Sequence, residues 1–293
     1  MTGEKRSLGT LLEHSRLEVI PTKDVADAVV QWVPRDVLLT VTASPVKGLD
    51  ATLALTRRLV GEGYRVVPHI SARLVADLSE LEKVSAELVA LGIDDIFVPA
   101  GDADPPVGPF DSALAMLQAL KSLGNPFPSV GVTGYPETHP KITDDVTIQA
   151  MWDKRQYATY IVSNLCFDHA TIRRWIERVR NRGVTLPLYI GIAAPIDRAK
   201  LFDVATKIGV GESAKFLTRH AEWFLRMGAP GGYNPVRLLQ RLNRTLIAEE
   251  SGIAGLHIFS FNQISKTEEW RQAQLARFGL AQSGSAPHQA AQA

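Results

Sequence analysis

The feature that most constrains the fold of this chain is a series of eight short apolar segments that recur along almost its whole length. Several of them are nearly continuous apolar runs, as expected for parallel strands that are covered on both faces. They lie at residues 15–22, 37–44, 64–72, 94–102, 127–135, 160–167, 186–194 and 255–262. The sequence therefore predicts eight parallel strands.

The segments between these strands have a helical pattern. In LDATLALTRRLVGEG (49–63) and LSELEKVSAELVALGI (78–93), leucine and valine recur at steps of three and four residues, and a glycine follows the last turn. Eight strand-then-helix units match a (β/α)8 barrel in number and length. We prefer this fold to an open doubly wound sheet because there are eight strands and no GxGxxG fingerprint follows the first.

We therefore expect an α/β protein with one domain, a (β/α)8 TIM barrel over residues 1–281. The span between the seventh and eighth strands, about residues 195–254, is long enough for a helical insertion. Residues 282–293 have no apolar periodicity, and this composition predicts a disordered C-terminal tail.

Composition narrows the class of protein. Hydrophobic residues make up 45% of the chain and charged residues 22%, which is typical of a globular protein with a full core. The net charge of +1 gives no electrostatic argument for binding to nucleic acid or to an anionic membrane. The single cysteine, Cys166, excludes an intrachain disulfide, and we expect a buried structural thiol. Without a membrane-length apolar run or a signal-peptide core, the default localisation is cytoplasmic.

Polar side chains follow seven of the eight predicted strands, at the end where barrel enzymes have their active sites. These residues are Glu18, Thr42, His69, Ser71, Asp102, Tyr135, Glu137, His139, Asn164 and Asn262. Polar groups within apolar strands are costly unless they pair or take part in function, so the set predicts a shared pocket. Individually, His69 could be a hydrogen-bonded core histidine, and Asn262 could bond to the backbone of a strand edge.

The motifs at these strand ends resemble, in order, those of the methylenetetrahydrofolate reductase family. GYPETHP (134–140) is similar to the family's fifth-strand motif, Gly/Ala-Tyr-Pro-Glu followed by His-Pro. The other matching stretches are LEVIPTK (17–23), PHIS (68–71), AGD (100–102), SNLCFD (163–168), YIGIAAPI (189–196) and LHIFSFN (256–262). Each match is weak alone, but the ordered set covers nearly the whole predicted barrel. The resemblance implies reduction of 5,10-methylenetetrahydrofolate to 5-methyltetrahydrofolate.

The resemblance also implies catalytic and substrate-binding residues. Glu18 stands where the family has its proposed acid, and Asp102 where an aspartate contacts the pterin and tunes the reacting centre. Asn164 replaces a glutamine that hydrogen-bonds the pterin, and Asn262 is the second substrate-binding candidate. A carboxylic acid can protonate a bridging nitrogen if an apolar setting raises its pKa, and Glu18 is flanked by apolar residues.

Five candidates stand at positions that bind cofactor in the family, namely Thr42, His69, Ser71, Tyr135 and His139. Other positions depart from the family pattern. Ala100 replaces an arginine, Ala43 and Ser44 replace a tyrosine and a glycine, and DKRQYAT (153–159) has no clear counterpart of the family lysine. IGVGES (208–213) is similar to a flavin-independent actinobacterial branch. The resemblance leaves FAD open, with loss favoured over retention, and leaves the choice between NADH and NADPH open.

The expected partners are therefore a tetrahydrofolate and a nicotinamide nucleotide, without nucleic acid or membrane. One alternative is oxidation of 5-methyltetrahydrofolate in methyl-group catabolism. Another is a non-catalytic barrel that binds folate or flavin, although such a protein would need no proton donor at Glu18. A metal site made of His69, His139 and Asp102 lacks any recognised ligand spacing, and we expect none.

Overall fold

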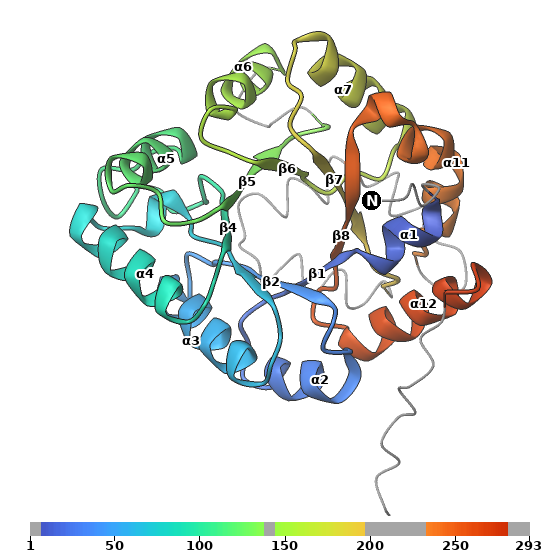
Figure 1. Ribbon diagram of the computed structural model, residues 1–293, viewed down its shortest axis with the longest axis horizontal. Coiled ribbons are helices and arrows are strands. Elements are labelled where there is room, and N and C mark those ends of the chain that lie inside the picture. The colour runs from blue at the N-terminus through green and yellow to red at the C-terminus, as the bar shows by residue number, and fades with distance from the viewer. Residues whose placement is uncertain (1–6, 138–143, 197–232, 281–293) are drawn as a thin grey trace, which may run out of the picture.

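The computed structural model describes residues 7–137, 144–196 and 233–280. Eight parallel strands form one sheet in the order β3-β2-β1-β8-β7-β6-β5-β4. They are β1 (Arg16–Val19), β2 (Leu38–Val41), β3 (Val66–Pro68), β4 (Asp95–Val98), β5 (Ser129–Gly134), β6 (Tyr160–Ser163), β7 (Leu188–Ala193) and β8 (Ile253–Phe259). The two ends of this order meet, since a parallel bridge joins His69 to Phe97 and the Ile70 N–H donates to the Phe97 carbonyl at 2.8 Å. The predicted (β/α)8 barrel is confirmed (Figure 1).

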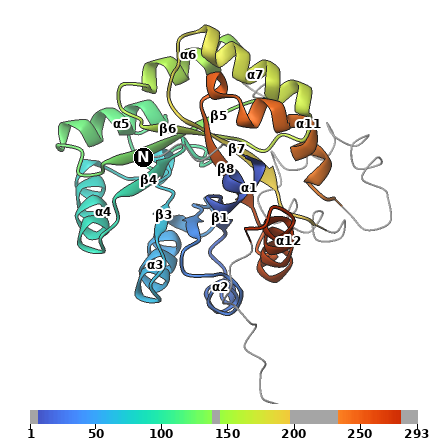
Figure 2. The ribbon, with the colours of Figure 1, turned by 45° about the vertical axis from the view of Figure 1, so that its right-hand side comes forward.

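Helices surround the strands in both views (Figures 1 and 2). The helices are α1 (Leu8–Glu13), α2 (Val25–Trp32), α3 (Gly48–Gly61), α4 (Leu78–Ala90), α5 (Ala113–Ser122), α6 (Asp144–Lys154), α7 (His169–Asn181), α11 (Val236–Ile247) and α12 (Ile264–Arg277). Short 3-10 turns lie at Ala72–Leu74 and Glu249–Ser251. The glycines expected after α3 and α4 have positive φ, +86° at Gly63 and +77° at Gly92, as a helix C-terminus requires.

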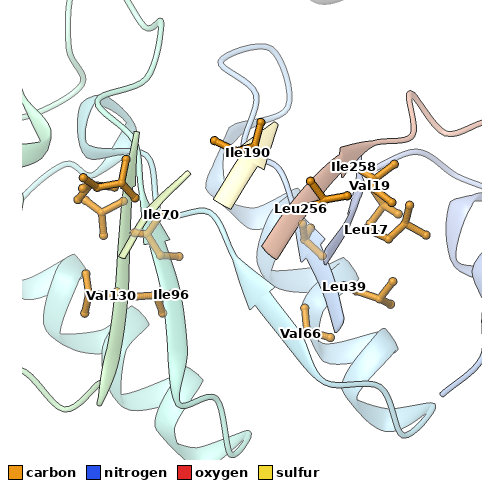
Figure 3. Close-up of a cluster of buried hydrophobic side chains, with 14 of the residues drawn as sticks. Leu17, Val19, Leu39, Val66, Ile70, Ile96, Val130, Ile190, Leu256 and Ile258 are labelled. Atoms are coloured by element: carbon orange, nitrogen blue, oxygen red, sulfur yellow. The ribbon is translucent and has the colours of Figure 1, made fainter. Parts of the chain in front are cut away.

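Strand alternation separates two buried layers. The outward side chains are aliphatic and pack with the helices in one large core, part of which is drawn in Figure 3. The labelled members of this layer are Leu17, Val19, Leu39, Val66, Ile70, Ile96, Val130, Ile190, Leu256 and Ile258. A second, smaller cluster contains Val67, Phe97, Tyr160 and Val162, and it fills the interior of the barrel. Because side chains alternate along a strand, polar residues of the opposite parity, such as Glu18, must also point inward.

The amino ends of the strands are closed by a buried polar cluster. Arg16, the first residue of β1, lies with Nη1 3.2 Å from Oδ2 of Asp95, the first residue of β4. Its guanidinium carbon lies 4.1 Å from the ring centroid of Tyr160 and 4.0 Å from that of Tyr189. The Tyr160 hydroxyl donates to Asp95 Oδ1 at 2.8 Å. The barrel is therefore filled at this end, and the candidate site lies toward the other.

The predicted helical insertion between the seventh and eighth strands is described only in part. Helix α11 and the 3-10 turn after it lie in this span, with Leu238, Leu239, Leu242 and Leu246 buried along one face of the helix. Residues 197–232 and the predicted tail at 282–293 lie outside the described residues.

Candidate active site

The centre of the candidate site is a contact between β1 and β8. Glu18 Oε2 lies 3.0 Å from Nε2 of His257, and the two side chains are 12% and 3% exposed. The backbone of Glu18 is fixed as well, because its carbonyl accepts a hydrogen bond from the Ser260 hydroxyl. The Glu18 carboxyl group is thus held inside the barrel with an imidazole as its partner.

A second histidine lies beside this pair. The ring centroid of His69, which follows β3, is 6.4 Å from that of His257 and 4.7 Å from that of Phe97. Burial lowers the pKa of His69 well below its usual range, and the charges of His257 and Arg16 act in the same direction. His69 is therefore neutral at physiological pH, and its Nε2 has no hydrogen-bond partner among the described residues.

Asp102 belongs to a second group, with Ser71 and Tyr135, at the carboxyl ends of β3, β4 and β5. It is exposed and follows Gly101, whose φ is +89°. A Cβ atom at Gly101 would lie 1.8 Å from Ser71 Oγ, so only glycine allows this close approach. Tyr135 is close enough to be influenced by Asp102: burial raises the pKa of the Tyr135 phenol, and the charge of Asp102 raises it further.

Thr42 and Asn164 lie at the carboxyl ends of β2 and β6. Thr42 is half-buried and its N–H donates to the Val19 carbonyl at 3.0 Å. Asn164 is exposed, and its Oδ1 accepts from the Leu165 N–H at 2.8 Å. The contacts of both side chains leave their predicted binding roles untested, and these roles stay predictions.

Asn262 joins the ends of β1 and β8. Its Oδ1 accepts from the Ile20 N–H at 2.8 Å, and its Nδ2 donates to the Ile20 carbonyl at 2.8 Å and to Thr22 Oγ1 at 3.0 Å. Both amide hydrogens are thus used within the protein, which is the backbone-bridging alternative considered from the sequence. The predicted role of Asn262 in substrate binding stays a prediction.

Cys166 and His139 complete the sequence-derived set. Cys166 is a buried free thiol, as predicted, and burial together with the charge of Glu137 raises its pKa. A thiol of this kind is a poor nucleophile, because only the thiolate reacts. His139 lies outside the described residues.

His257 was not among the residues predicted from the sequence. The signal for His257 was the alternation along strand eight. Leu256 and Ile258 lie on the outward face, so His257 and Phe259 lie on the inward face. Phe259 adds an aromatic wall, with its ring centroid 4.8 Å from that of His257.

The cofactor-binding candidates that the structure describes differ in their exposure. Within the described residues, His69 is 7% exposed and packs on Phe97, while Ser71 is 3% exposed and lies against Gly101. Thr42 and Tyr135 are half-buried. The predicted roles of these residues in cofactor binding stay predictions, and no chemical step below is assigned to FAD. The described part of the chain also has no group of three or more His, Cys, Asp or Glu side chains placed to hold a metal ion.

Two comparisons with known proteins agree on one family. A sequence model of the family "Methylenetetrahydrofolate reductase" matches residues 31–270. A segment of 101 residues is 29% identical to Methylenetetrahydrofolate reductase 2 of Saccharomyces cerevisiae. This segment is 32% of the present chain and 17% of the yeast protein, so the similarity covers a small part of that relative.

Among the described helices, none has both the length and the apolar character needed to cross a membrane.

Proposed function

The chain belongs to the methylenetetrahydrofolate reductase family, and from this premise we propose that it reduces 5,10-methylenetetrahydrofolate to 5-methyltetrahydrofolate with NADH or NADPH. The observation that carries the proposal is the Glu18 carboxyl group, which is held inside the barrel in hydrogen-bond contact with His257. A folate-binding barrel without catalysis would have no need of a buried acid there.

The first chemical step is opening of the imidazolidine ring. The methylene carbon bridges N5 and N10, and it becomes an electrophile when N10 is protonated. The Glu18 carboxylic acid gives its proton to N10, and the electron pair of the C–N10 bond stays on N10. The product is a cationic iminium at N5. General acids of this kind contribute about 10²–10⁴-fold to rate.

The second requirement is stabilisation of the positive charge. Asp102 stands on the loop after β4, at the same end of the barrel, and its side chain is exposed to an incoming ligand. An ionised carboxylate beside a cationic iminium lowers the energy of the charged intermediate. The rigid turn at Gly101 holds this carboxylate in position relative to β4.

Hydride then comes from the nicotinamide ring and adds to the iminium carbon. Direct transfer is supported by the altered positions Ala43, Ser44 and Ala100. One NAD(P)H and one proton are consumed for each 5-methyltetrahydrofolate formed.

The experiment is an anaerobic assay of NADH and NADPH oxidation by the purified protein with 5,10-methylenetetrahydrofolate and no added flavin. The visible spectrum of the protein is recorded first. Turnover by a colourless protein is the expected result. Turnover that requires added FAD would retain folate reduction and reject direct transfer. The absence of turnover both with and without FAD would overturn the proposed function.

A further inference from the structure

His257 is the buried hydrogen-bond partner of Glu18, the acid of the proposed reaction. It lies within β8, is buried, and places Nε2 at the Glu18 carboxyl group. Its Nδ1 is buried and has no hydrogen-bond partner among the described residues. The ring is therefore held through Nε2, and this is the atom through which a proton can pass between the imidazole and the Glu18 carboxyl group.

We propose that His257 is a positioning residue that shares one proton with Glu18, so that the pair and not the carboxyl group alone is the acid of the reaction. This inference rests on the proposed function, because it concerns how the same acid is kept protonated. The proton lies either on His257, which gives a carboxylate and an imidazolium, or on Glu18, which gives a carboxylic acid and a neutral imidazole. The two forms interconvert by transfer across the 3.0 Å contact.

The proton balance of a turnover follows from this arrangement. The bond from oxygen to hydrogen at Glu18 breaks and the bond from N10 to hydrogen forms. The pair is then left as a carboxylate with a neutral imidazole. One proton from solvent restores it before the next turnover, and this is the proton that the overall reaction consumes. An imidazole in general retains a proton to higher pH than a carboxylate does, so a shared proton is kept to higher pH than a lone carboxyl group would keep it.

The surroundings favour His257 over His69 for this role. Besides Glu18, the charged and titratable residues near His257 are Arg16, its register partner on β1, and His69 after β3. Asp95, Tyr160 and Tyr189 surround Arg16. Both His69 and His257 are buried, but His257 alone of these two has a carboxylate at hydrogen-bond distance in the described residues. An imidazolium is stabilised by that carboxylate, whereas His69 is kept neutral by burial.

The test compares His257→Gln with His257→Phe. Glutamine can still hydrogen-bond Glu18 but cannot carry the extra proton, and phenylalanine can do neither. We expect His257→Gln to lower kcat by about 10²-fold, with KM for the folate changed by less than about 3-fold. The alkaline limb of its pH–rate profile should move toward acid by about one to two pH units, since a carboxyl group alone must then hold the proton. His14→Asn, an exposed histidine before β1, is the matched control and should behave as wild type.

Wild-type rate and an unshifted profile in His257→Gln would overturn the inference while leaving the proposed function intact. An inactive wild-type enzyme would instead count against the proposed function. NMR of the His257 ring gives a readout that needs neither substrate nor activity, and serves if the His257 variants do not fold. In Glu18→Gln, the His257 ring should lose its second proton at lower pH than in wild type. An identical ring titration in the two proteins would overturn the inference.

Discussion

Glu18 Oε2 and His257 Nε2 lie 3.0 Å apart although the two residues are separated by almost the whole chain. The contact exists because β1 and β8 pair in parallel and close the barrel, with Arg16 opposite His257 and Glu18 opposite Phe259. The strand pairing that closes the barrel therefore also brings Glu18 and His257 together. A change that loosens the β1–β8 seam should also weaken catalysis.

Glu18→Gln isolates the acid from the fold. The amide keeps the size of the side chain and a hydrogen bond to His257 but cannot donate the required proton, so we expect kcat to fall by about 10²–10⁴-fold. Folate affinity, measured by isothermal titration calorimetry, should stay within about 3-fold of wild type. Glu13→Gln removes a carboxylate from α1 instead and is the control. Turnover that survives Glu18→Gln would reject Glu18 as the acid.

Gly101→Ala should destabilise the loop that carries Asp102. The new Cβ would lie 1.8 Å from Ser71 Oγ, and φ is +89°, where residues with a side chain are strained. We expect the free energy of unfolding in urea to fall by about 1–3 kcal/mol. Gly61→Ala has no atom within 4 Å of its new Cβ and should be neutral or slightly stabilising. Equal stability of the two variants would show that the turn at Gly101 is not constrained.

The sequence predicted the barrel because its signal is repeated. Each apolar strand is short and ambiguous alone, but eight of them in alternation with helical patterns leave few folds, and all eight were found at the expected places. The observed strands are shorter than the predicted segments, since β1 ends at Val19 although the apolar stretch was read to residue 22. Hydrogen bonding ends a strand, and hydrophobicity alone does not mark that point.

The site was less predictable for a physical reason. A resemblance identifies positions such as Glu18, but not the partner that a distant strand supplies, and His257 and Arg16 were missed for this reason. Asn262 was singled out correctly as a polar residue at a strand end. Its hydrogen bonds to Ile20, which come from tertiary structure, could not be distinguished from a ligand contact in the sequence.

Asn262→Ala should separate these two roles. The substitution leaves the N–H and the carbonyl of Ile20 without their partner and places alanine at a φ of +57°, so we expect a loss of about 1–3 kcal/mol in unfolding free energy. Asn125→Ala is the control, because Asn125 has a φ of +37° but is exposed. An increase in folate KM without loss of stability would instead support a substrate contact.

Arg16→Met should show how much the barrel depends on the buried cluster at its amino end. The variant leaves the Asp95 carboxylate buried without its cation, and removal of one partner of a buried pair costs about 3–5 kcal/mol. Arg58→Met is the control, because the Arg58–Asp27 pair is exposed and worth at most about 1 kcal/mol. A loss in Arg16→Met no greater than in the control would show that Asp95 is adequately solvated without Arg16.

Lys154→Met should stabilise the protein at neutral pH and lose this advantage at high pH. Burial lowers the pKa of Lys154 to about 8, and Asp153 offsets only part of the effect. The folded chain thus binds the proton less tightly than the unfolded chain, in which lysine titrates near 10.4. Wild-type stability is therefore reduced below pH 8 and recovers as the pH rises toward 10.4.

Urea unfolding at pH 7 should show Lys154→Met more stable by up to about 3 kcal/mol, with little difference above pH 10.4. Lys83→Met changes an exposed lysine and should show no such pH-dependent gain; the same gain in both variants would contradict the effect of burial.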